Sequence, residues 1–366
     1  MRGRADPDGF VAFDRFMETA LYAEGVGYYD RGPSPFGPRG DFYTAPHVHP
    51  LFARTVAARI RAACDGLVGP GPVRVVELGP GDGTLAEGVI RALGRAGPRA
   101  PVEYVLVERS ASLGRTALER AGAAGEEVGR PIRRAASIAA DGPGRGVVLA
   151  NELMDALPAR RLRWTGNGWA ELGVRVEGDR IVPAEAPVRE PVPAPPLPDR
   201  PEVGTVVEIS AAAEALVREV ADHLVEGLFI ILDYGMGQSE LIAAHPRGTL
   251  GAVRGHRTVD DPLSSPGETD LSVFVNFDRL RAAARAAGWA ELAYRSQAEA
   301  LGAWGFPELL AAALREARSA EEEVRLRLAA KNLLFGFDRF RALELGIPRD
   351  GGAGTVSPGP GAGARP

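Results

Sequence analysis

The most regular pattern of apolar and polar positions lies between residues 73 and 232. Short apolar runs rich in Val, Leu and Ile occur at 73–78, 102–107, 147–150 and 228–232. The first two runs are each followed by a stretch with helical apolar spacing, at 84–93 and 112–121, and Thr84 is placed to cap the first of these helices. Alternating short strands and helices are typical of a parallel sheet covered on both faces. The pattern therefore predicts an α/β fold.

The segments that flank this α/β pattern, and one within it, have different sequence patterns. Residues 10–21 and 51–63 have the spacing of amphipathic helices, and the loop 25–46 between them is rich in glycine, proline and aromatic residues. Residues 163–184 alternate polar and apolar positions around turn signals, which predicts antiparallel strands. The proline-rich 183–201 predicts an extended surface connection.

We predict three parts for the chain. Residues 1–70 form N-terminal helices and a cover loop, and 71–346 form the core with an insertion at about 160–204. Residues 347–366 are rich in Gly, Pro and Ala and predict a disordered tail.

A glycine-rich turn, Glu77-Leu78-Gly79-Pro80-Gly81-Asp82-Gly83, joins the first strand to its helix. Glycine admits positive φ and lets a ligand approach the backbone, and the N–H groups at the helix start favour a negatively charged ligand group. Glu108 ends the second strand, where a carboxylate can accept both ribose hydroxyls of an adenosine.

The spacing of the turn discriminates between nucleotides. A dinucleotide fingerprint places its third glycine at position 84, where this chain has Thr84. The combination favours S-adenosylmethionine (SAM), which has a carboxylate and a ribose but no pyrophosphate. NAD or FAD, and a tight turn that binds no ligand, are the alternatives.

A second polar cluster, Asn151-Glu152-Leu153-Met154-Asp155, directly follows the third strand. The carboxyl ends of strands face the ligand crevice in open α/β sheets. Glu152 and Asp155 are three residues apart, so a helical turn would put both carboxylates on one side, where they could hold a guanidinium. An asparagine cap with two solvated acids is the alternative.

The remaining polar candidates are single residues. Asp233 ends another strand and either lines the crevice or pairs with an arginine. His47 in the cover loop is a candidate general base, with a surface histidine as the alternative, and no metal site is expected because His47 and His49 lack a further ligand at suitable spacing. His223 is predicted to face solvent, and Trp289 and Trp304 to pack in the core.

Several motifs occur together in a specific order. They are Gly40-Asp41-Phe42-Tyr43-Thr44-Ala45-Pro46, the turn 77–83, Asn151-Glu152-x-x-Asp155-Ala156-Leu157-Pro158, Asp233-Tyr234-Gly235, His256 and Pro266-Gly267-x-x-Asp270-Leu271. This ordered set resembles the MidA family of class I SAM-dependent methyltransferases, over about residues 13–346. Mitochondrial members act as respiratory complex I assembly factors and methylate a protein arginine.

The resemblance implies a fold and a set of roles. The fold is a Rossmann-like seven-stranded methyltransferase sheet with an N-terminal helical cover and the inserted antiparallel β segment. The SAM-binding residues would be Glu77, Gly79, Gly81, Gly83, Glu108 and Asn151. Glu152 and Asp155 would be catalytic and face the acceptor, and a group formed by Asp41, Phe42, Tyr43, Thr44, His47 and Asp233 would belong to the substrate side or the cover loop.

The chain departs from the family pattern on the presumed acceptor side. His47 stands where a glutamate is usual, and Phe52-Ala53-Arg54 replaces Phe-Gly-Glu. Asp270-Leu271-Ser272-Val273-Phe274-Val275-Asn276-Phe277 lacks a usual histidine and acid. These differences leave the acceptor open.

Composition and charge narrow the partners. The chain has 43 Lys and Arg and 48 Asp and Glu residues, which gives a net charge of −5. Non-specific electrostatic binding to nucleic acid is therefore not expected. Cys64 is the one cysteine, which excludes an internal disulfide or a cysteine zinc cluster. No apolar stretch approaches the ~18 residues of a membrane span, and residues 1–7 do not predict a secretory signal, so a cytoplasmic location is expected.

We therefore expect a SAM-dependent methyltransferase that acts on a protein arginine. No bound metal and no binding to nucleic acid or membranes are expected, and a homodimer is possible. A small-molecule O- or N-methyltransferase and a non-catalytic SAM-binding assembly factor are the alternatives.

Overall fold

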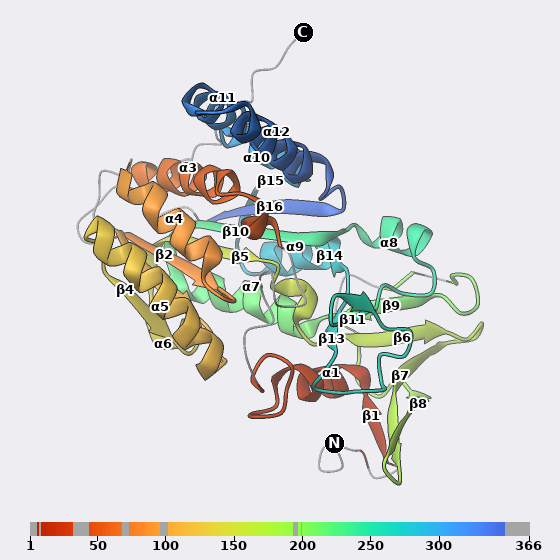
Figure 1. The fold of residues 1–366 in the computed structure, drawn as a ribbon. Helices are drawn as coiled ribbons and strands as arrows, with labels where there is room; N and C mark the ends of the chain where they lie inside the picture. The colour runs from red at the N-terminus through yellow and green to blue at the C-terminus, as the bar shows by residue number, and fades with distance from the viewer. Residues whose placement is uncertain are drawn as a thin grey trace. The chain divides into compact units, whose positions relative to one another are not determined.

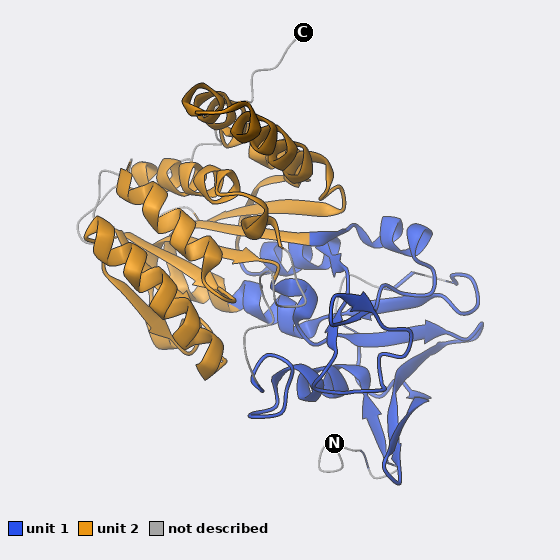
Figure 2. Cartoon of the chain, in the orientation of Figure 1, with its two compact units in different colours: residues 1–35, 153–218, 234–287 blue, residues 36–152, 219–233, 288–366 orange. Residues whose placement is uncertain are grey.

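A computed structural model describes residues 6, 9–31, 44–67, 73–95, 102–192, 197–198 and 200–347. The chain forms two compact units (Figure 2). Unit 1 consists of residues 1–35, 153–218 and 234–287, and unit 2 of 36–152, 219–233 and 288–366. The division differs from our predicted parts, because it passes through the predicted N-terminal segment 1–70. The predicted tail beyond residue 347 lies outside the described residues.

Unit 2 contains the predicted parallel sheet. The strands lie in the order β15-β16-β10-β5-β2-β3-β4 (Figure 1). Their bounds are β2 Val73–Leu78, β3 Val102–Val107, β4 Ile132–Ala135, β5 Gly144–Asn151, β10 Leu224–Met236, β15 Ala290–Ser296 and β16 Phe340–Ile347. Strands β4, β3, β2, β5 and β10 pair in parallel, and β15 runs antiparallel to β16. Each of the four predicted core strands is present in this sheet.

The helices of unit 2 pack around this sheet (Figure 1). They are α2 Ala45–Val48, α3 Leu51–Gly66, α4 Thr84–Arg95, α5 Ala111–Val128, α6 Ile138–Asp141, α10 Gln297–Ala303, α11 Phe306–Glu316 and α12 Ala320–Phe335. The apolar faces of all these helices except α6 join the sheet in one core that includes Val75, Ile90 and Leu149. Helix α7, Ala211–His223, crosses from unit 1 into unit 2 at residue 218.

Unit 1 is built on antiparallel strands. One sheet has the order β1-β7-β6-β9, with β8 also paired to β7. The bounds are β1 Phe10–Ala12, β6 Arg160–Trp164, β7 Trp169–Glu177, β8 Arg180–Pro187 and β9 Val206–Ile209. The antiparallel strands predicted from 163–184 are thus present. Pro183 lies inside β8 and pairs with Val174, so the extended connection begins later than we predicted.

A smaller sheet and several helices also belong to unit 1. The sheet has the order β12-β11-β13, and β14 pairs with the last residues of β10. These elements are α1 Phe13–Tyr22, η2 Met154–Ala156, α8 Gln238–Ala244, β11 Gly251–Arg254, β12 Arg257–Thr258, β13 Asp270–Ser272, β14 Val275–Asn276 and α9 Phe277–Ala286.

His223 corrects one sequence prediction. Its side chain is buried, not exposed, and Nε2 lies 3.2 Å from the Asp141 carboxylate. Burial lowers the pKa of His223, more than the Asp141 charge raises it. Trp304 follows the prediction, because it is buried and its indole N–H donates to Glu344 at 3.1 Å. None of the described helices is long and apolar enough to cross a membrane.

Candidate cofactor site and acceptor residues

A cavity of about 40 Å³ lies at the β2–α4 turn of unit 2. The structure brings together there seven of the residues singled out from the sequence. They are Thr44, His47, Glu77, Gly79, Gly81, Asn151 and Glu152. The cavity is also lined by Pro46, Pro80, Asp82, Thr84 and Leu85, which were not among the predicted site residues. The carboxyl ends of β2 and β5 meet here, as the sheet topology requires.

The glycines of the turn divide into two roles. Gly79 and Gly81 line the cavity with φ of 62° and 57°, a left-handed conformation in which a Cβ would be strained. Gly83 is absent from the cavity lining, and a Cβ on it would lie 2.8 Å from the Cα of Ala117 in α5. Gly83 therefore permits close helix packing, a role that sequence spacing did not distinguish from ligand contact.

Glu77 is the most buried acid of the cavity, with 2% of its surface exposed. The Tyr104 hydroxyl donates to Oε2 at 2.6 Å. Burial raises the pKa of Glu77, the Tyr104 hydrogen bond lowers it, and the Asp82 charge raises it again, to about 7 in sum. Glu77 can therefore exchange a proton near neutral pH.

Asp82 organises the opposite side of the turn. Its carboxylate accepts from Thr84 N at 3.1 Å and from the Thr84 hydroxyl at 3.0 Å, so Asp82, not Thr84, caps the start of α4. Arg120 pairs with the same carboxylate at 3.0 Å. Burial alone would raise the pKa of Asp82, but hydrogen bonds from His47 and Thr84 and the charge of Arg120 outweigh it and lower the pKa.

His47 lies between two polar partners. Nδ1 is 2.8 Å from the Thr44 hydroxyl, and Nε2 is 3.3 Å from Asp82 Oδ2. Its side chain is 10% exposed and lies in α2, so the surface-histidine alternative is wrong. Both ring nitrogens therefore contact protein groups, so His47 can accept a proton from a ligand only where the ligand displaces one of these partners.

Glu152 lies in an unusual backbone conformation. Its φ is 52°, and its N–H donates to Leu232 O at 2.8 Å. Oε1 accepts from Ala45 N at 3.3 Å and from the Asn151 amide at 3.4 Å. Positive φ in a non-glycine residue is a strained arrangement that is frequent at functional sites. The short helix η2 begins only at Met154, so Glu152 and Asp155 do not share the helical turn that we predicted.

Glu108 directly follows β3 but is not part of the cavity lining. It is 8% exposed, and Oε1 accepts from Ser110 N at 2.9 Å. Burial raises the pKa of Glu108 more than the Ser110 hydrogen bond lowers it. Asp233 is likewise wholly buried, in β10, and lines neither this cavity nor its rim.

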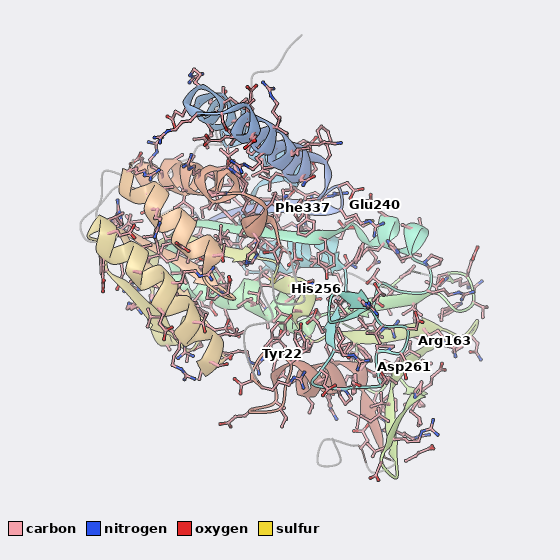
Figure 3. The ribbon with its side chains drawn as sticks, in the orientation of Figure 1. Tyr22, Arg163, Glu240, His256, Asp261 and Phe337 are labelled. Atoms are coloured by element: carbon pink, nitrogen blue, oxygen red, sulfur yellow. The ribbon has the colours of Figure 1, made fainter. Side chains whose placement is uncertain are left out.

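Asp155 belongs to unit 1 and lies in a cluster of aromatic and acidic side chains. The Tyr234 hydroxyl donates to Oδ2 at 2.5 Å, and Tyr234 packs edge-on against Phe274. Burial raises the pKa of Asp155 to about 6, against the Tyr234 hydrogen bond, which lowers it. In the same unit, the Tyr29 hydroxyl donates to Asp270 at 2.7 Å. Tyr22, labelled in Figure 3, donates to Ala156 O at 2.8 Å.

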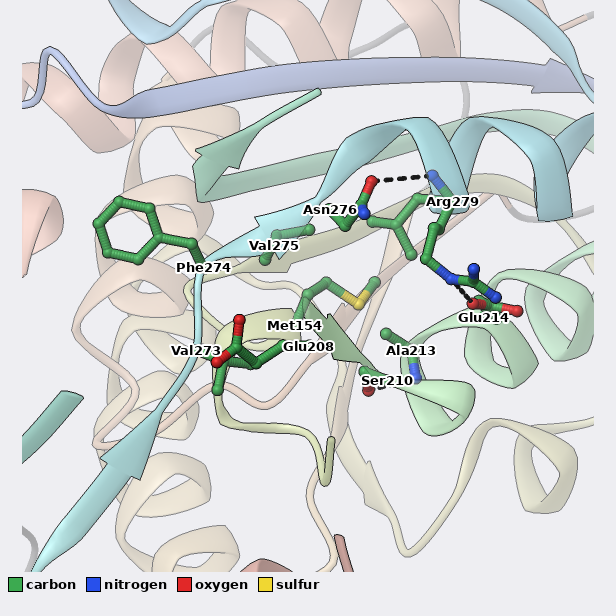
Figure 4. A pocket seen from close by; sticks show the side chains of 11 residues that line it. Met154, Glu208, Ser210, Ala213, Glu214, Val273, Phe274, Val275, Asn276 and Arg279 are labelled. Atoms are coloured by element: carbon green, nitrogen blue, oxygen red, sulfur yellow. Dashed lines mark hydrogen bonds and ion pairs between the residues drawn. The ribbon is translucent and has the colours of Figure 1, made fainter. Parts of the chain in front are cut away.

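Unit 1 contains a small cavity of its own. Figure 4 shows its lining, with the Arg279–Glu214 pair at one end. The Arg279–Glu214 pair is buried, with Arg279 Nε 2.6 Å from the Glu214 carboxylate, and the cavity volume of about 20 Å³ suffices for a water molecule.

The cover-loop residues Asp41, Phe42 and Tyr43 lie outside the described residues.

Comparison with known proteins identifies the chain. The model of a family of S-adenosyl-L-methionine-dependent methyltransferases matches residues 51–295. The chain belongs to this family. It is 27% identical over 315 residues to the Protein arginine methyltransferase NDUFAF7 homolog, mitochondrial, of Drosophila melanogaster, which covers 79% of this chain and 70% of that protein. The Danio rerio protein, named protein arginine methyltransferase NDUFAF7, mitochondrial, is 27% identical over 304 residues. The match covers 75% of this chain and 68% of the Danio rerio protein.

The solved structures agree with the family assignment. A Burkholderia thailandensis protein crystallised with S-adenosyl-homocysteine is 31% identical, with a TM-score of 0.83 over 96% of this chain and 92% of that one. The resemblance to the MidA family and the class I methyltransferase fold are thereby confirmed, and SAM is the methyl donor.

Proposed function

We propose that this methyltransferase transfers the methyl group of SAM to a protein arginine, with the donor held at the β2–α4 turn. The observation that carries the proposal is the charge of the cavity. Three carboxyl side chains line it, from Glu77, Asp82 and Glu152, and no Lys or Arg is among the lining residues that the structure describes. Arg120, outside the lining, pairs with Asp82, which leaves Glu77 and Glu152 to face a cation. Such a cavity favours a cationic ligand over a pyrophosphate.

The residues of unit 2 fit the parts of SAM. Gly79 and Gly81 leave room for the ligand against the backbone, and Glu77 faces the cavity as a partner for the ammonium group. We assign the ribose to Glu108, whose other oxygen would remain on Ser110 N. Asn151 and Gly83 complete the set proposed from the motifs, Gly83 through packing. When bound, SAM supplies an electrophilic methyl group on a sulfonium.

The acceptor side needs a group that binds a guanidinium and removes its charge. Glu152 lines the cofactor cavity and can hold a guanidinium N–H. On the motif Asn151-Glu152-x-x-Asp155 alone, we assign to Asp155, whose pKa is raised to about 6, the proton that the guanidinium nitrogen loses. That proton leaves as the bond from nitrogen to the methyl carbon forms and the bond from carbon to sulfur breaks. The names of the relatives support arginine as the acceptor.

A second candidate rests on His47. Its imidazole lies at the cavity with Nε2 on Asp82, and a hydroxyl acceptor that displaced the Thr44 hydroxyl from Nδ1 would meet an oriented base. A small-molecule O-methyltransferase would then need His47 more than Glu152.

The test is methyl transfer from radiolabelled SAM to a cell lysate, separated into proteins and small metabolites. Arginine methylation predicts label on protein that survives acid hydrolysis as methylarginine and is lost in Glu152→Gln and Asp155→Asn. Label on metabolites that is lost in His47→Asn would instead establish the second candidate. Calorimetric titration of the same variants with SAM distinguishes a variant that no longer binds SAM from one that binds SAM but no longer transfers the methyl group. A cellular phenotype that is unchanged by all three substitutions would indicate that the protein acts as a non-catalytic scaffold.

A further inference from the structure

A second cavity of unit 2 has no part in the proposed reaction. It has a volume of about 580 Å³ and lies among α3, α4 and α11 (Figure 1). Its floor is made of small side chains, Ala57, Ala58, Gly88, Ala92, Ala312 and Ala313. A Cβ on Gly88 would lie 2.5 Å from the Ala53 Cβ, so α3 and α4 touch beneath the cavity. We call this cavity the arginine groove.

Four arginines line the groove. Arg54 and Arg61 are seven residues apart on α3, and Arg91 and Arg95 are four apart on α4. Both spacings place side chains on one face of a helix. Glu316 is the one acidic residue among the described lining residues. The chain as a whole has a net charge of −5, so this local positive excess opposes the overall balance.

Most of this charge has no ion-pair partner among the described residues. Arg91 pairs with Glu87 at 3.3 Å and with Glu127 at 3.0 Å. Arg54, Arg61 and Arg95 have no ion pair within the part of the chain that the structure describes. Like charges gathered without counter-charges repel one another, and an anionic ligand in the groove would remove this repulsion.

The shape and chemistry of the groove indicate the class of ligand. Its volume lies in the range of about 300–1,000 Å³ that is typical of small-molecule sites, whereas a protein partner generally covers a wider surface. Arginine binds phosphate oxygens in a bidentate manner. Leu309, which is only partly buried, adds apolar surface to the alanines, and an organic group can lie on it.

We propose that the arginine groove binds an organic molecule with two or more phosphate groups, of the nucleoside di- or triphosphate class. This site is separate from the SAM cavity, although α4 begins at that cavity with Thr84 and reaches the groove with Arg91 and Arg95. Its ligand is distinguished from SAM by charge, because one cavity is lined by acids and the other by arginines.

The test is calorimetric titration of the full chain with ATP, in saturating S-adenosyl-homocysteine so that the cofactor cavity is occupied. We expect one ATP per chain, binding that weakens with added salt, weaker binding of tripolyphosphate, and none of adenosine. Arg95→Ala should weaken ATP about tenfold, and Arg54→Ala with Arg61→Ala about a hundredfold. Arg325→Ala, an exposed arginine on α12 outside the groove, should leave the affinity unchanged.

Three results would overturn the proposal. They are no ATP binding, ATP binding that the double substitution leaves intact, and binding of a polyglutamate peptide in place of ATP, which would identify the occupant as an acidic protein segment. SAM titrations of the same variants keep the two sites apart. Unchanged SAM affinity with lost ATP binding supports the groove. If Arg54→Ala with Arg61→Ala loses SAM as well, Arg95→Ala decides: weakened ATP with unchanged SAM affinity supports the groove, and unchanged ATP affinity overturns it.

Discussion

The protonation of Glu77 gives the sharpest quantitative prediction. Its pKa is about 7 in the folded protein, against an ordinary value of 4.5, because burial disfavours the carboxylate. The folded state therefore holds a proton that the unfolded state has already released. This contribution to stability is fully present below about pH 4.5 and is lost as pH rises to about 7. At about 1.4 kcal/mol per pH unit, the loss amounts to about 3 kcal/mol.

Glu77→Gln removes the ionisation and can retain the hydrogen bond from Tyr104. We expect the variant to exceed the wild type in free energy of unfolding by about 3 kcal/mol at pH 8 and to equal it near pH 4. Urea unfolding followed by circular dichroism between pH 4 and 8.5 measures the difference, with the exposed Glu119→Gln on α5 as the control. A difference that does not change with pH would refute the reasoning.

The same ionisation affects the donor. A cationic SAM favours ionised Glu77, so SAM affinity should rise with pH through about 7 in the wild type and stay level in Glu77→Gln. Calorimetric titrations at pH 6 and pH 8 compare the two proteins. A wild-type affinity that is equal at both pH values would place Glu77 away from the positive charge of the donor.

Three further predictions follow from particular contacts. Gly83→Val forces a β-branched residue to φ of 81° against α5, and thermal unfolding should report a loss of about 3 kcal/mol or more, while Gly122→Ala, with open space around it, should be neutral or stabilising. The methylation rate should rise with pH through about 6 as Asp155 ionises, and a pH profile of Asp155→Asn should be low and level. Arg59 pairs with the buried Glu344 carboxylate at 2.6 Å, so Arg59→Met leaves that charge buried without this partner. Urea unfolding should show a loss of about 3–5 kcal/mol in the free energy of unfolding, and adding Glu344→Gln should restore much of it.

Local pattern predicted the elements that surround the cofactor cavity. The strand 73–78 and the glycine turn could be recognised because a buried parallel strand is a continuous apolar run and because its turn needs positive φ. Glu77, Gly79, Gly81 and Asn151 therefore appear together at the cavity as expected.

Contacts between distant parts of the chain could not be predicted in this way. Gly83 packs on Ala117, and His47 is held by Asp82, 35 residues away in sequence. His223 is buried beside Asp141 for the same kind of reason. Asp82 could have been found, because an acid inside a glycine turn and next to a helix start is a frequent cap. The φ of Glu152 depends on its hydrogen bond to β10 and left no local signal.

The most direct measurement is a crystal structure of the full chain with S-adenosyl-homocysteine. The account predicts the ligand against Gly79 and Gly81, its amino group near the Glu77 carboxylate and both ribose hydroxyls within hydrogen-bond distance of Glu108. Electron density for the nucleoside elsewhere would contradict the account, and so would a ribose with no hydrogen bond to Glu108, whose carboxylate would then accept only from Ser110 N.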